Sequence, residues 1–136
     1  MSGNYLITGC AGFIGAKVVE LLLTESNTVV GVDDLNEAYD VRLKMWRLER
    51  LSSDRFKFIR SDISNLDGIR KLFSENKFDA VINLAARAGV RHSMSDPASY
   101  LASNLNGALN LLEMCKEYGV PKLVQASTSS VYGDIN

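Results

Sequence analysis

The stretch Tyr5-Leu-Ile-Thr-Gly-Cys-Ala-Gly-Phe-Ile-Gly15 decides the fold, because it reads as an apolar strand, a glycine turn and the start of a helix. Its glycines stand at every third position. We expect Gly9 to allow a sharp turn, Gly12 to let an anion approach the backbone, and Gly15 to allow close packing of helix and strand. The free amide groups and the dipole of the first helical turn favour a phosphate here. A tight turn without a ligand is the alternative interpretation.

Two features beyond the turn distinguish the possible phosphate-binding loops. A Walker-type loop requires Gly-Lys-Ser/Thr, but Gly15 is followed by Ala-Lys-Val, so that loop is excluded. A dinucleotide site requires an acidic residue at the end of the next strand to bind the adenosine ribose. Asp33 and Asp34 follow the apolar run 28–32. The pattern therefore predicts a dinucleotide site, and Asp33 favours NAD over NADP because a carboxylate repels a 2′-phosphate.

The overall composition is that of one ordinary α/β domain. The chain has 136 residues, of which 46% are hydrophobic and 23% charged, with a net charge of −1. This charge disfavours a nucleic-acid surface, which is usually basic. We find no apolar run of membrane-spanning length and no secretory signal, so we expect a cytoplasmic protein without membrane contact.

Few residues are available for a metal site. Cys10 and Cys115 stand far apart and match no metal-binding spacing, and His92 is the single histidine. We therefore expect two reduced thiols and no metal.

Hydrophobic periodicity predicts strict alternation of strands and helices. The expected strands are 5–8, 28–32, 56–60, 78–85 and 122–126, and the expected helices are 13–24, 40–51, 66–73 and 97–118. Short connections and strict alternation favour right-handed crossovers and a doubly wound parallel sheet with helices on both faces.

Caps and buried faces are also predicted for three of these helices. Asn65 or Ser64 is expected to cap the third helix, and Asp96 or Ser95 the fourth. The expected inward residues are Leu43, Trp46 and Leu48 or Leu51 in the second helix, Leu66, Ile69, Leu72 and Phe73 in the third, and Tyr100, Leu101, Leu105, Ala108, Leu111, Leu112 and Cys115 in the fourth.

Polar residues gather after the predicted strand ends. Asp33, Asp62 and the segments 85–91 and 127–130 all follow a strand, so they should meet at one edge of a parallel sheet. Ligands of such sheets bind at this edge, near the point where strand order switches.

Six motifs make the chain similar to the extended short-chain dehydrogenase/reductase family. It most resembles the nucleotide-sugar 4-epimerases that act on UDP-glucuronate or UDP-glucose. The motifs are Thr8-Gly-Cys-Ala-Gly-Phe-Ile-Gly15, Gly31-Val-Asp-Asp-Leu-Asn36, Ser61-Asp-Ile63, Asn83-Leu-Ala-Ala-Arg-Ala-Gly-Val-Arg91, Ser103-Asn-Leu-Asn-Gly107 and Ser127-Thr-Ser-Ser-Val-Tyr-Gly133.

The resemblance implies a Rossmann-type sheet that binds NAD. Phe13 and Ile14 would lie on the pyrophosphate, Asp33 would hold the adenosine ribose, and Asp62 and Ile63 would flank the adenine. The nicotinamide side would be lined by Leu84, Ala85, Ala86 and Ala88, with Asn104 contributing from the long helix. The complete candidate set is Gly9, Gly12, Phe13, Ile14, Gly15, Asp33, Asp34, Leu35, Asn36, Asp62, Ile63, Leu84, Ala85, Ala86, Ala88 and Asn104.

Two further residues are candidates for catalysis and for substrate binding. Thr128 aligns with the family's catalytic Ser/Thr, although an ordinary strand-end hydroxyl is the alternative. Arg91 is a candidate for an anionic sugar, or else an exposed loop arginine. The chain departs from the family at Asn83, where histidine is usual, and at 129–130, where two serines replace the acidic pair of the dehydratases.

The family's Tyr-x-x-x-Lys pair is not found on a predicted helix. Tyr118 and Lys122 have the spacing, but Gly119 and Pro121 end the helix between them, and Tyr132 has Asn136 four residues on. We therefore expect residues 1–136 to be an NAD-binding domain without its substrate domain and with an incomplete sheet, either a fragment or a naturally short product. The full-length protein would be a homodimer that binds a UDP-sugar.

Three functional hypotheses remain. The first is the NAD-binding part of a nucleotide-sugar 4-epimerase, inactive by itself. The second is a non-catalytic NAD-binding module or sensor. The third is an NAD(P)-dependent reductase or dehydratase of the same family, which Asp33 and the two serines disfavour.

Overall fold

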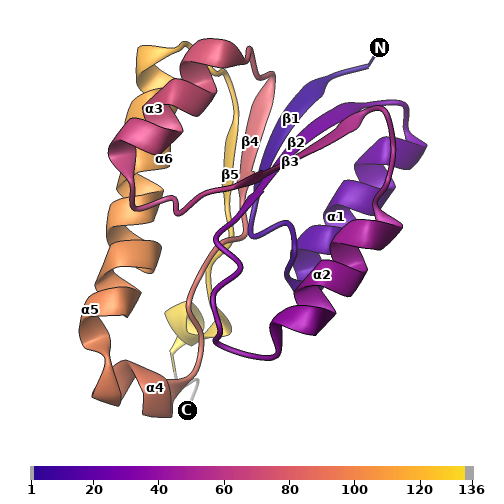
Figure 1. The fold of residues 1–136 in the computed structure, drawn as a ribbon. Coiled ribbons are helices and arrows are strands. Elements are labelled where there is room, and N and C mark those ends of the chain that lie inside the picture. Colours follow the sequence, from indigo (N-terminus) through magenta and orange to yellow (C-terminus); the bar gives the residue numbers. More distant parts are fainter. Residues whose placement is uncertain (1, 134–136) are drawn as a thin grey trace.

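In the computed structural model, which describes residues 2–133, five parallel strands form one sheet in the order β3-β2-β1-β4-β5 (Figure 1). Strand order switches at β1, because the chain adds β2 and β3 on one side of it and β4 and β5 on the other. This arrangement confirms the predicted doubly wound parallel sheet. The strands are β1 (Asn4–Thr8), β2 (Thr28–Asp33), β3 (Phe56–Arg60), β4 (Ala80–Asn83) and β5 (Leu123–Gln125).

Helices cover both faces of the sheet (Figure 1). Helices α1 (Phe13–Thr24) and α2 (Val41–Arg50) lie over one face, and α3 (Leu66–Glu75) and α6 (Gly107–Glu117) over the other. Adjacent residues of β1 serve the two cores, since Leu6 packs in the cluster of α3 and α6 and Ile7 in that of α1. This alternation is the period of two that a strand imposes.

Helix α3 follows the prediction in its cap and most of its buried face. The Asn65 side chain accepts a hydrogen bond from the Gly68 amide, and Ile69, Leu72 and Phe73 are buried. Leu66 is exposed at the helix start.

The buried face of α2 differs from the prediction. Leu43 and Trp46 are about half exposed, whereas Lys44 is buried and Leu48 and Leu51 pack on the core. Lys44, Leu48 and Leu51 share one helix face because they stand four and three residues apart. Periodicity alone misassigned this face because it treats lysine as an exterior residue.

The predicted long helix is a composite. It begins as α5 (Pro97–Tyr100), passes through a π-helical segment η1 (Leu101–Asn106) and continues as α6. A separate short helix that was not predicted, α4 (Val90–Ser95), precedes it. The Asp96 side chain accepts from the Ser99 amide at 3.3 Å, which confirms it as the cap of α5.

The inward face of this composite helix was only partly predicted. Leu111 and Cys115 are buried and Ala108 and Tyr100 half-buried, but Leu101, Leu105 and Leu112 are more than half exposed. Gly107 and Met114 complete the buried face.

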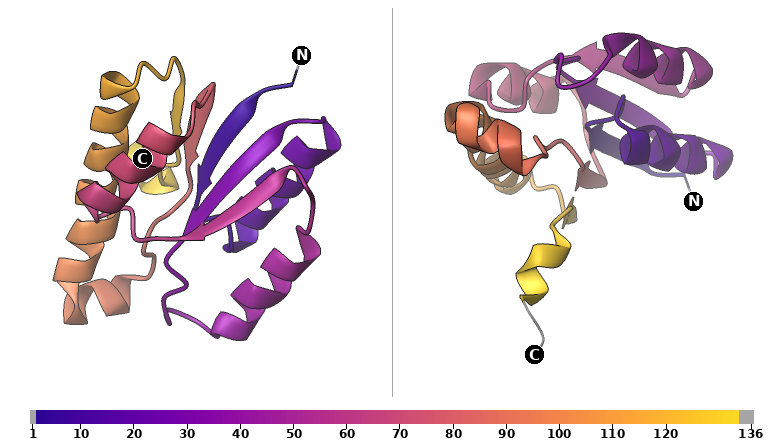
Figure 2. Two further views of the ribbon diagram at one scale, coloured as in Figure 1. Left: turned by 45° about the horizontal axis from the view of Figure 1, so that its top comes forward. Right: turned by 90° about the horizontal axis from the view of Figure 1, so that it is seen from below.

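The segment after the fifth strand has few neighbours. β5 is followed by a 3₁₀ turn, η2 (Ser129–Tyr132), which projects from the body of the domain (Figure 2). The predictions that involve residues 134–136, including the Tyr132–Asn136 spacing, lie outside the described residues. Within residues 2–133, none of the helices combines the length and apolar character needed to cross a membrane.

Candidate functional site

A pocket of about 660 Å³ lies at the carboxyl ends of β1, β2, β3 and β4. This is the edge at which ligands of doubly wound sheets bind, and it includes the switch point between β1 and β4. The pocket is lined by Gly9, Gly12, Val32, Asp33, Asp34, Asn36, Glu37, Ala38, Tyr39, Lys44, Ser61, Asp62, Ile63, Leu84, Ala85, Ala86, Arg87, Ala88, His92, Asp96, Ser99, Tyr100 and Ser103.

The glycine turn is too crowded for side chains at two positions. Gly9 has a φ of +67°, and a Cβ there would lie 2.8 Å from the backbone of Leu84 and Ala85. A Cβ on Gly15 would lie 2.0 Å from the Gly9 carbonyl oxygen, so Gly15 permits the close helix approach predicted for it. Gly12 is the N-cap of α1 and offers no side-chain acceptor, so the first-turn amides of α1 have no side-chain cap there.

Asp33 is buried at the end of β2 and is held by its surroundings. One carboxylate oxygen accepts from the Leu35 amide at 2.9 Å, and the other accepts from the Ala11 amide at 3.2 Å. The Lys44 ammonium lies 3.6 Å from the first of these oxygens. The carboxylate is therefore fixed between the glycine turn and α2.

The loop after β2 is closed by short-range hydrogen bonds. The side-chain Nδ2 of Asn36 donates to both carboxylate oxygens of Asp34, and the side-chain Oδ1 of Asn36 accepts from the Ala38 backbone amide. Leu35 is buried with a φ of +55°, a left-handed conformation that lets its amide reach Asp33. Asp34 and Asn36 consequently line the pocket, while Leu35 packs behind them.

The loop after β3 is held against α6. The Asn110 side chain donates to the carbonyl oxygens of Ile63 and Ser64 at 2.9 and 3.1 Å. A Cβ on Gly107 would lie 2.5 Å from the Ile63 side chain, so glycine there allows this close approach. Asp62 lines the pocket and also accepts from the Ser64 amide.

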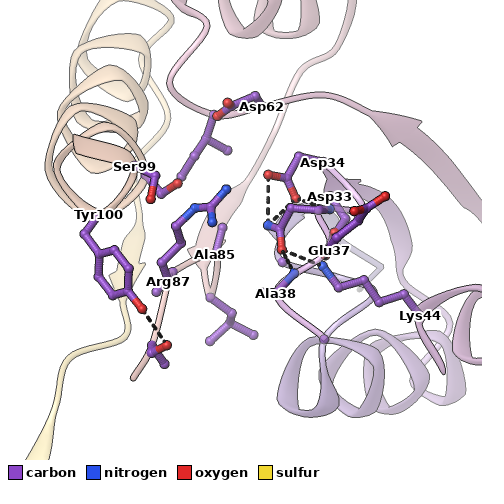
Figure 3. Close-up of a pocket in the computed structure, with 18 of the residues that line it drawn as sticks. Asp33, Asp34, Glu37, Ala38, Lys44, Asp62, Ala85, Arg87, Ser99 and Tyr100 are labelled. Carbon is purple, nitrogen blue, oxygen red and sulfur yellow. Dashed lines mark hydrogen bonds and ion pairs between the residues drawn. The ribbon is translucent and has the colours of Figure 1, made fainter. Parts of the chain in front are cut away.

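The opposite wall is formed by the loop after β4 and the start of the composite helix (Figure 3). The Tyr100 hydroxyl donates to the Ala88 carbonyl at 2.8 Å and to the Gly89 carbonyl at 2.9 Å as alternative acceptors. The Asn104 side chain accepts from the Arg87 amide and donates to the Arg87 carbonyl. The Arg87 side chain extends into the space between the two walls, and its Nε is buried without a hydrogen-bond partner among the described residues.

Asn83 connects three strands behind the pocket. Its side-chain oxygen accepts from the Thr8 hydroxyl on β1, and its side-chain nitrogen donates to the side-chain oxygen of Gln125 on β5 at 2.8 Å. The Thr8 hydroxyl in turn accepts from the Ala85 amide. The residue that departs from the family pattern thus joins β1, β4 and β5 through one polar network.

The structure brings together most of the predicted site. Gly9, Gly12, Asp33, Asp34, Asn36, Asp62, Ile63, Leu84, Ala85, Ala86 and Ala88 line the pocket. Phe13, Ile14, Gly15, Leu35 and Asn104 border it without lining it, with Phe13 and Ile14 exposed at the start of α1.

The structure does not place the candidate catalytic residue Thr128 or the candidate substrate-binding residue Arg91 in the pocket lining. Arg91 lies exposed in α4, and Thr128 lies exposed at the N-cap of η2, where its hydroxyl accepts from the Ser130 amide (Figure 2). Both segments follow parallel strands and so lie at the expected edge of the sheet, but the pocket lining does not include Arg91 or Thr128. Tyr118 is the C-cap of α6 and Lys122 precedes β5, so they do not share a helix turn.

Sequence reasoning missed two cations of the pocket, Lys44 and Arg87. Lys44 shares a helix face with Leu48 and Leu51, but this spacing does not show that its ammonium is buried against Asp33. Arg87 lies inside the motif 83–91, in which only the apolar residues 84–86 and 88 were predicted to contact the cofactor.

Burial and hydrogen bonding perturb two groups at the site. Desolvation, with a smaller contribution from the Asp33 charge, raises the pKa of the Cys10 thiol far above its ordinary value. Hydrogen bonds from Ser99, first of its side chain and then of its amide, lower the pKa of Asp96. Within residues 2–133 there is no group of three or more His, Cys, Asp or Glu side chains that could hold a metal ion.

A parallel sheet with a pocket at its switch point, bordered by a glycine turn and an acidic strand end, defines the Rossmann class of α/β domains. The family model for GDP-mannose 4,6 dehydratase matches residues 6–136, so the chain belongs to this family. This confirms the resemblance to short-chain dehydrogenase/reductases.

Individual relatives are similar over nearly the whole chain. A UDP-glucuronate 4-epimerase of Thermodesulfobacterium geofontis (strain OPF15) is 56% identical over 131 residues, which are 96% of this chain and 41% of that protein. The crystal structure of the Bacillus cereus UDP-glucuronic acid 4-epimerase in complex with UDP-glucuronic acid and NAD is 39% identical. It matches 98% of this chain and 42% of its own, with a TM-score of 0.87.

A more distant structure supports the same fold. The Thermus thermophilus UDP-glucose 4-epimerase, in complex with NAD, is 36% identical with a TM-score of 0.82, over 98% of this chain and 40% of its own. The chain thus spans about two fifths of the length of the relatives it matches.

Proposed function

We propose that residues 1–136 form the NAD-binding part of a nucleotide-sugar 4-epimerase. The observation that carries this proposal is the pocket itself, which joins the glycine turn to a fixed, buried Asp33. A carboxylate at the end of β2 accepts hydrogen bonds from ribose hydroxyls and disfavours a 2′-phosphate. Similarity to two epimerases crystallised with NAD supports the same cofactor.

The described residues fit a dinucleotide at three points. Gly12 leaves the backbone at the start of α1 open to a pyrophosphate, where the helix dipole favours an anion. Arg87 presents a guanidinium with a buried, unpartnered Nε, which a phosphate oxygen can satisfy. Asp62 and Ile63 form a mixed polar and apolar wall suited to an adenine ring.

For the reaction, the bound nicotinamide would supply the hydride acceptor and donor for oxidation and reduction at C4 of the sugar. The chain would contribute binding and orientation through the apolar wall of Leu84, Ala85, Ala86 and Ala88. The family description names a dehydratase, but 56% identity to a UDP-glucuronate 4-epimerase favours epimerisation. Ser129 and Ser130, in place of the dehydratase acidic pair, agree with this choice.

We also propose that cofactor binding and proton transfer are carried out by different residues of the whole enzyme. The family resemblance assigns proton transfer to a helical Tyr-x-x-x-Lys pair, and the helices of residues 2–133 contain none. Thr128 would assist as the catalytic hydroxyl and Arg91 would approach an anionic sugar, although both lie outside the pocket. The purified 136-residue chain should therefore not epimerise UDP-glucuronate or UDP-glucose, and measurable turnover would contradict this assignment.

The leucine stripe Leu101, Leu105, Leu109 and Leu112 supports a homodimer of the whole protein. All four side chains are more than half exposed, and they recur at helical spacing along η1 and α6. A second copy of this chain is the partner we propose. Leu105→Lys should shift sedimentation toward the monomer, whereas Leu21→Lys on the exposed face of α1 should not. Equal behaviour of both variants would contradict this interface.

Both cysteines are free and buried, which agrees with a reducing compartment, and we propose a cytoplasmic location.

The cofactor proposal is tested by calorimetric titration of NAD into the purified chain. We expect saturable binding that weakens at least about tenfold in Asp33→Ala, because the ribose loses a buried acceptor. Asp67→Ala, which removes a carboxylate at the start of α3, is the control and should bind like the wild type. Absence of binding by a folded wild-type chain, or equal binding by Asp33→Ala, would contradict the proposal.

A further inference from the structure

Lys44 is an unusual residue for a helix of the domain surface. It is 4% exposed, on the face of α2 that packs against the loop after β2. Burial of an ammonium costs several kcal/mol unless the charge is paired. Here the ammonium is 3.6 Å from the Asp33 carboxylate and donates to the side-chain oxygen Oδ1 of Asn36 at 3.3 Å. Asp33 and Lys44 thus form a buried ion pair inside the pocket.

The ammonium has bonding capacity that its neighbours do not use. An ammonium has three donors, and Asn36 accepts one at hydrogen-bond distance. The Tyr39 ring, whose centroid lies 5.0 Å away, adds a cation–π contact. Lys44 also lines the pocket together with Asp33, so a ligand at Asp33 meets both charges (Figure 3).

Other charges near this end of the pocket are placed differently. Arg47 donates to the Ala11 carbonyl and the Tyr39 hydroxyl, and Arg60 donates to the Asp34 carbonyl. Arg87 lies on the opposite wall. Asp34 is bonded to Asn36, and Glu37 is a further carboxylate of the pocket lining. Lys44 is therefore the cation in direct partnership with Asp33.

We propose that Lys44 is a cofactor-specificity residue whose charge is balanced by Asp33. In the native pair, the ammonium orients the carboxylate and donates to a ribose hydroxyl of NAD. When the Asp33 charge is removed, the same buried ammonium becomes a site for the 2′-phosphate of NADP. The preference for NAD is then a property of the Asp33–Lys44 pair and not of Asp33 alone. This inference rests on the proposed NAD site and assigns one of its determinants.

The test compares NAD and NADP binding by calorimetry in four chains: wild type, Asp33→Asn, Asp33→Asn/Lys44→Met and Asp33→Asn/Lys17→Met. Lys17 is 75% exposed on α1, so its removal matches the change in net charge without touching the pocket. We expect NADP affinity to rise about tenfold or more in Asp33→Asn, because an unbalanced buried ammonium gains an anion. The gain should vanish with Lys44→Met and persist with Lys17→Met.

A second variant and a second readout protect the test from a folding defect. Asp33→Ser keeps a neutral acceptor for the neighbouring amides and should show the same gain. Because NADP binds only the folded state, it should also raise the Tm of Asp33→Asn more than that of Asp33→Asn/Lys44→Met.

Three results would contradict the inference. The first is that the wild-type chain binds NAD but neither Asp33→Asn nor Asp33→Ser gains affinity for NADP. The second is that the gain in NADP affinity persists after Lys44→Met. The third is that Lys17→Met abolishes this gain as completely as Lys44→Met does. A folded wild-type chain that binds no NAD would instead overturn the proposed function, and this inference with it.

Discussion

The two halves of the sheet differ in how firmly they hold their strand-end segments. In the β1–β2 half, residues 4–39, the buried positions Leu6, Ile7, Cys10 and Val32 have no exposed surface. In the β4–β5 half, residues 80–132, Val124 is 54% exposed and Tyr132 79%. The first half places Asp33, Asp34 and Asn36 in the pocket, whereas the second lines it with the segments 84–88 and 92–103 but leaves Thr128 outside it.

The contrast shows what fixes a binding site in this fold. Gly9 and Gly15 pack against backbone, and both oxygens of Asp33 are bonded to main-chain amides. These contacts are local in space and involve rigid groups, so they preform the end of the pocket where we propose that the adenosine ribose binds. Thr128 is held by a bond to Ser130 within its own turn, which orients the turn but does not fix it to the pocket.

The largest expected effect concerns the packing of the glycine turn. Gly15→Ala should lower the free energy of unfolding by about 3 kcal/mol, because its Cβ would lie 2.0 Å from the Gly9 backbone oxygen, which accepts a hydrogen bond from the Gly12 amide. Gly119→Ala is the control: it has a φ of +66° but nothing within 4 Å of its Cβ, so about 1 to 2 kcal/mol is expected. Urea unfolding measures both. Similar losses would contradict the difference in packing between the halves.

The next prediction concerns the polar network that joins the halves. Asn83→Leu should cost about 2 kcal/mol in urea unfolding, because it leaves the buried Thr8 hydroxyl without its acceptor and Gln125 without its donor. Gln125→Ala should cost less than half of this, since Gln125 is exposed. Equal losses in the two variants would show that burial does not determine how much each hydrogen bond of this network contributes to stability.

The rates of thiol labelling compare how readily the two halves of the domain open locally. Burial raises the pKa of both thiols, and Cys10 also meets the Asp33 charge. We expect maleimide at pH 8 to label Cys115, on the buried face of α6, about tenfold faster than Cys10, a difference of about 1.4 kcal/mol in opening free energy. Mass spectrometry after digestion measures each site. Faster labelling of Cys10 would reverse the proposed order of stability.

The smallest effect is expected at Thr128. Thr128→Ala removes an exposed cap of a four-residue turn, so the free energy of unfolding should change by less than about 0.5 kcal/mol and NAD affinity should not change measurably. Thr8→Val, at a buried hydroxyl, is the contrasting variant and should be clearly destabilised. A large loss in Thr128→Ala would show that η2 packs more firmly than its exposure indicates.

Much of the fold was predictable because local signals agreed. Alternating strand and helix patterns located every strand, the Asn65 and Asp96 caps were recognised, and Asp33 was placed at its strand end. The glycine turn was predictable because steric demand on glycine is local and independent of tertiary contacts.

The predictions from sequence differ from the structure where tertiary contacts determine which residues are buried. Lys44 is buried by its partnership with Asp33, which lies eleven positions earlier and carries no helical signal. The composite helix is apolar on two sides, so periodicity could not tell the Leu111 face from the Leu105 face. Thr128 does not line the pocket and caps η2, which projects from the body of the domain; a motif does not reveal this placement.

Amide hydrogen exchange with and without NAD tests the central claim most directly. If the pocket binds the dinucleotide between its two walls, exchange should slow at the amides of 9–15, 33–38 and 84–88, with no change at 73–78 on the other side of the domain. Protection confined to 73–78, or unchanged exchange at saturating NAD, would contradict the account.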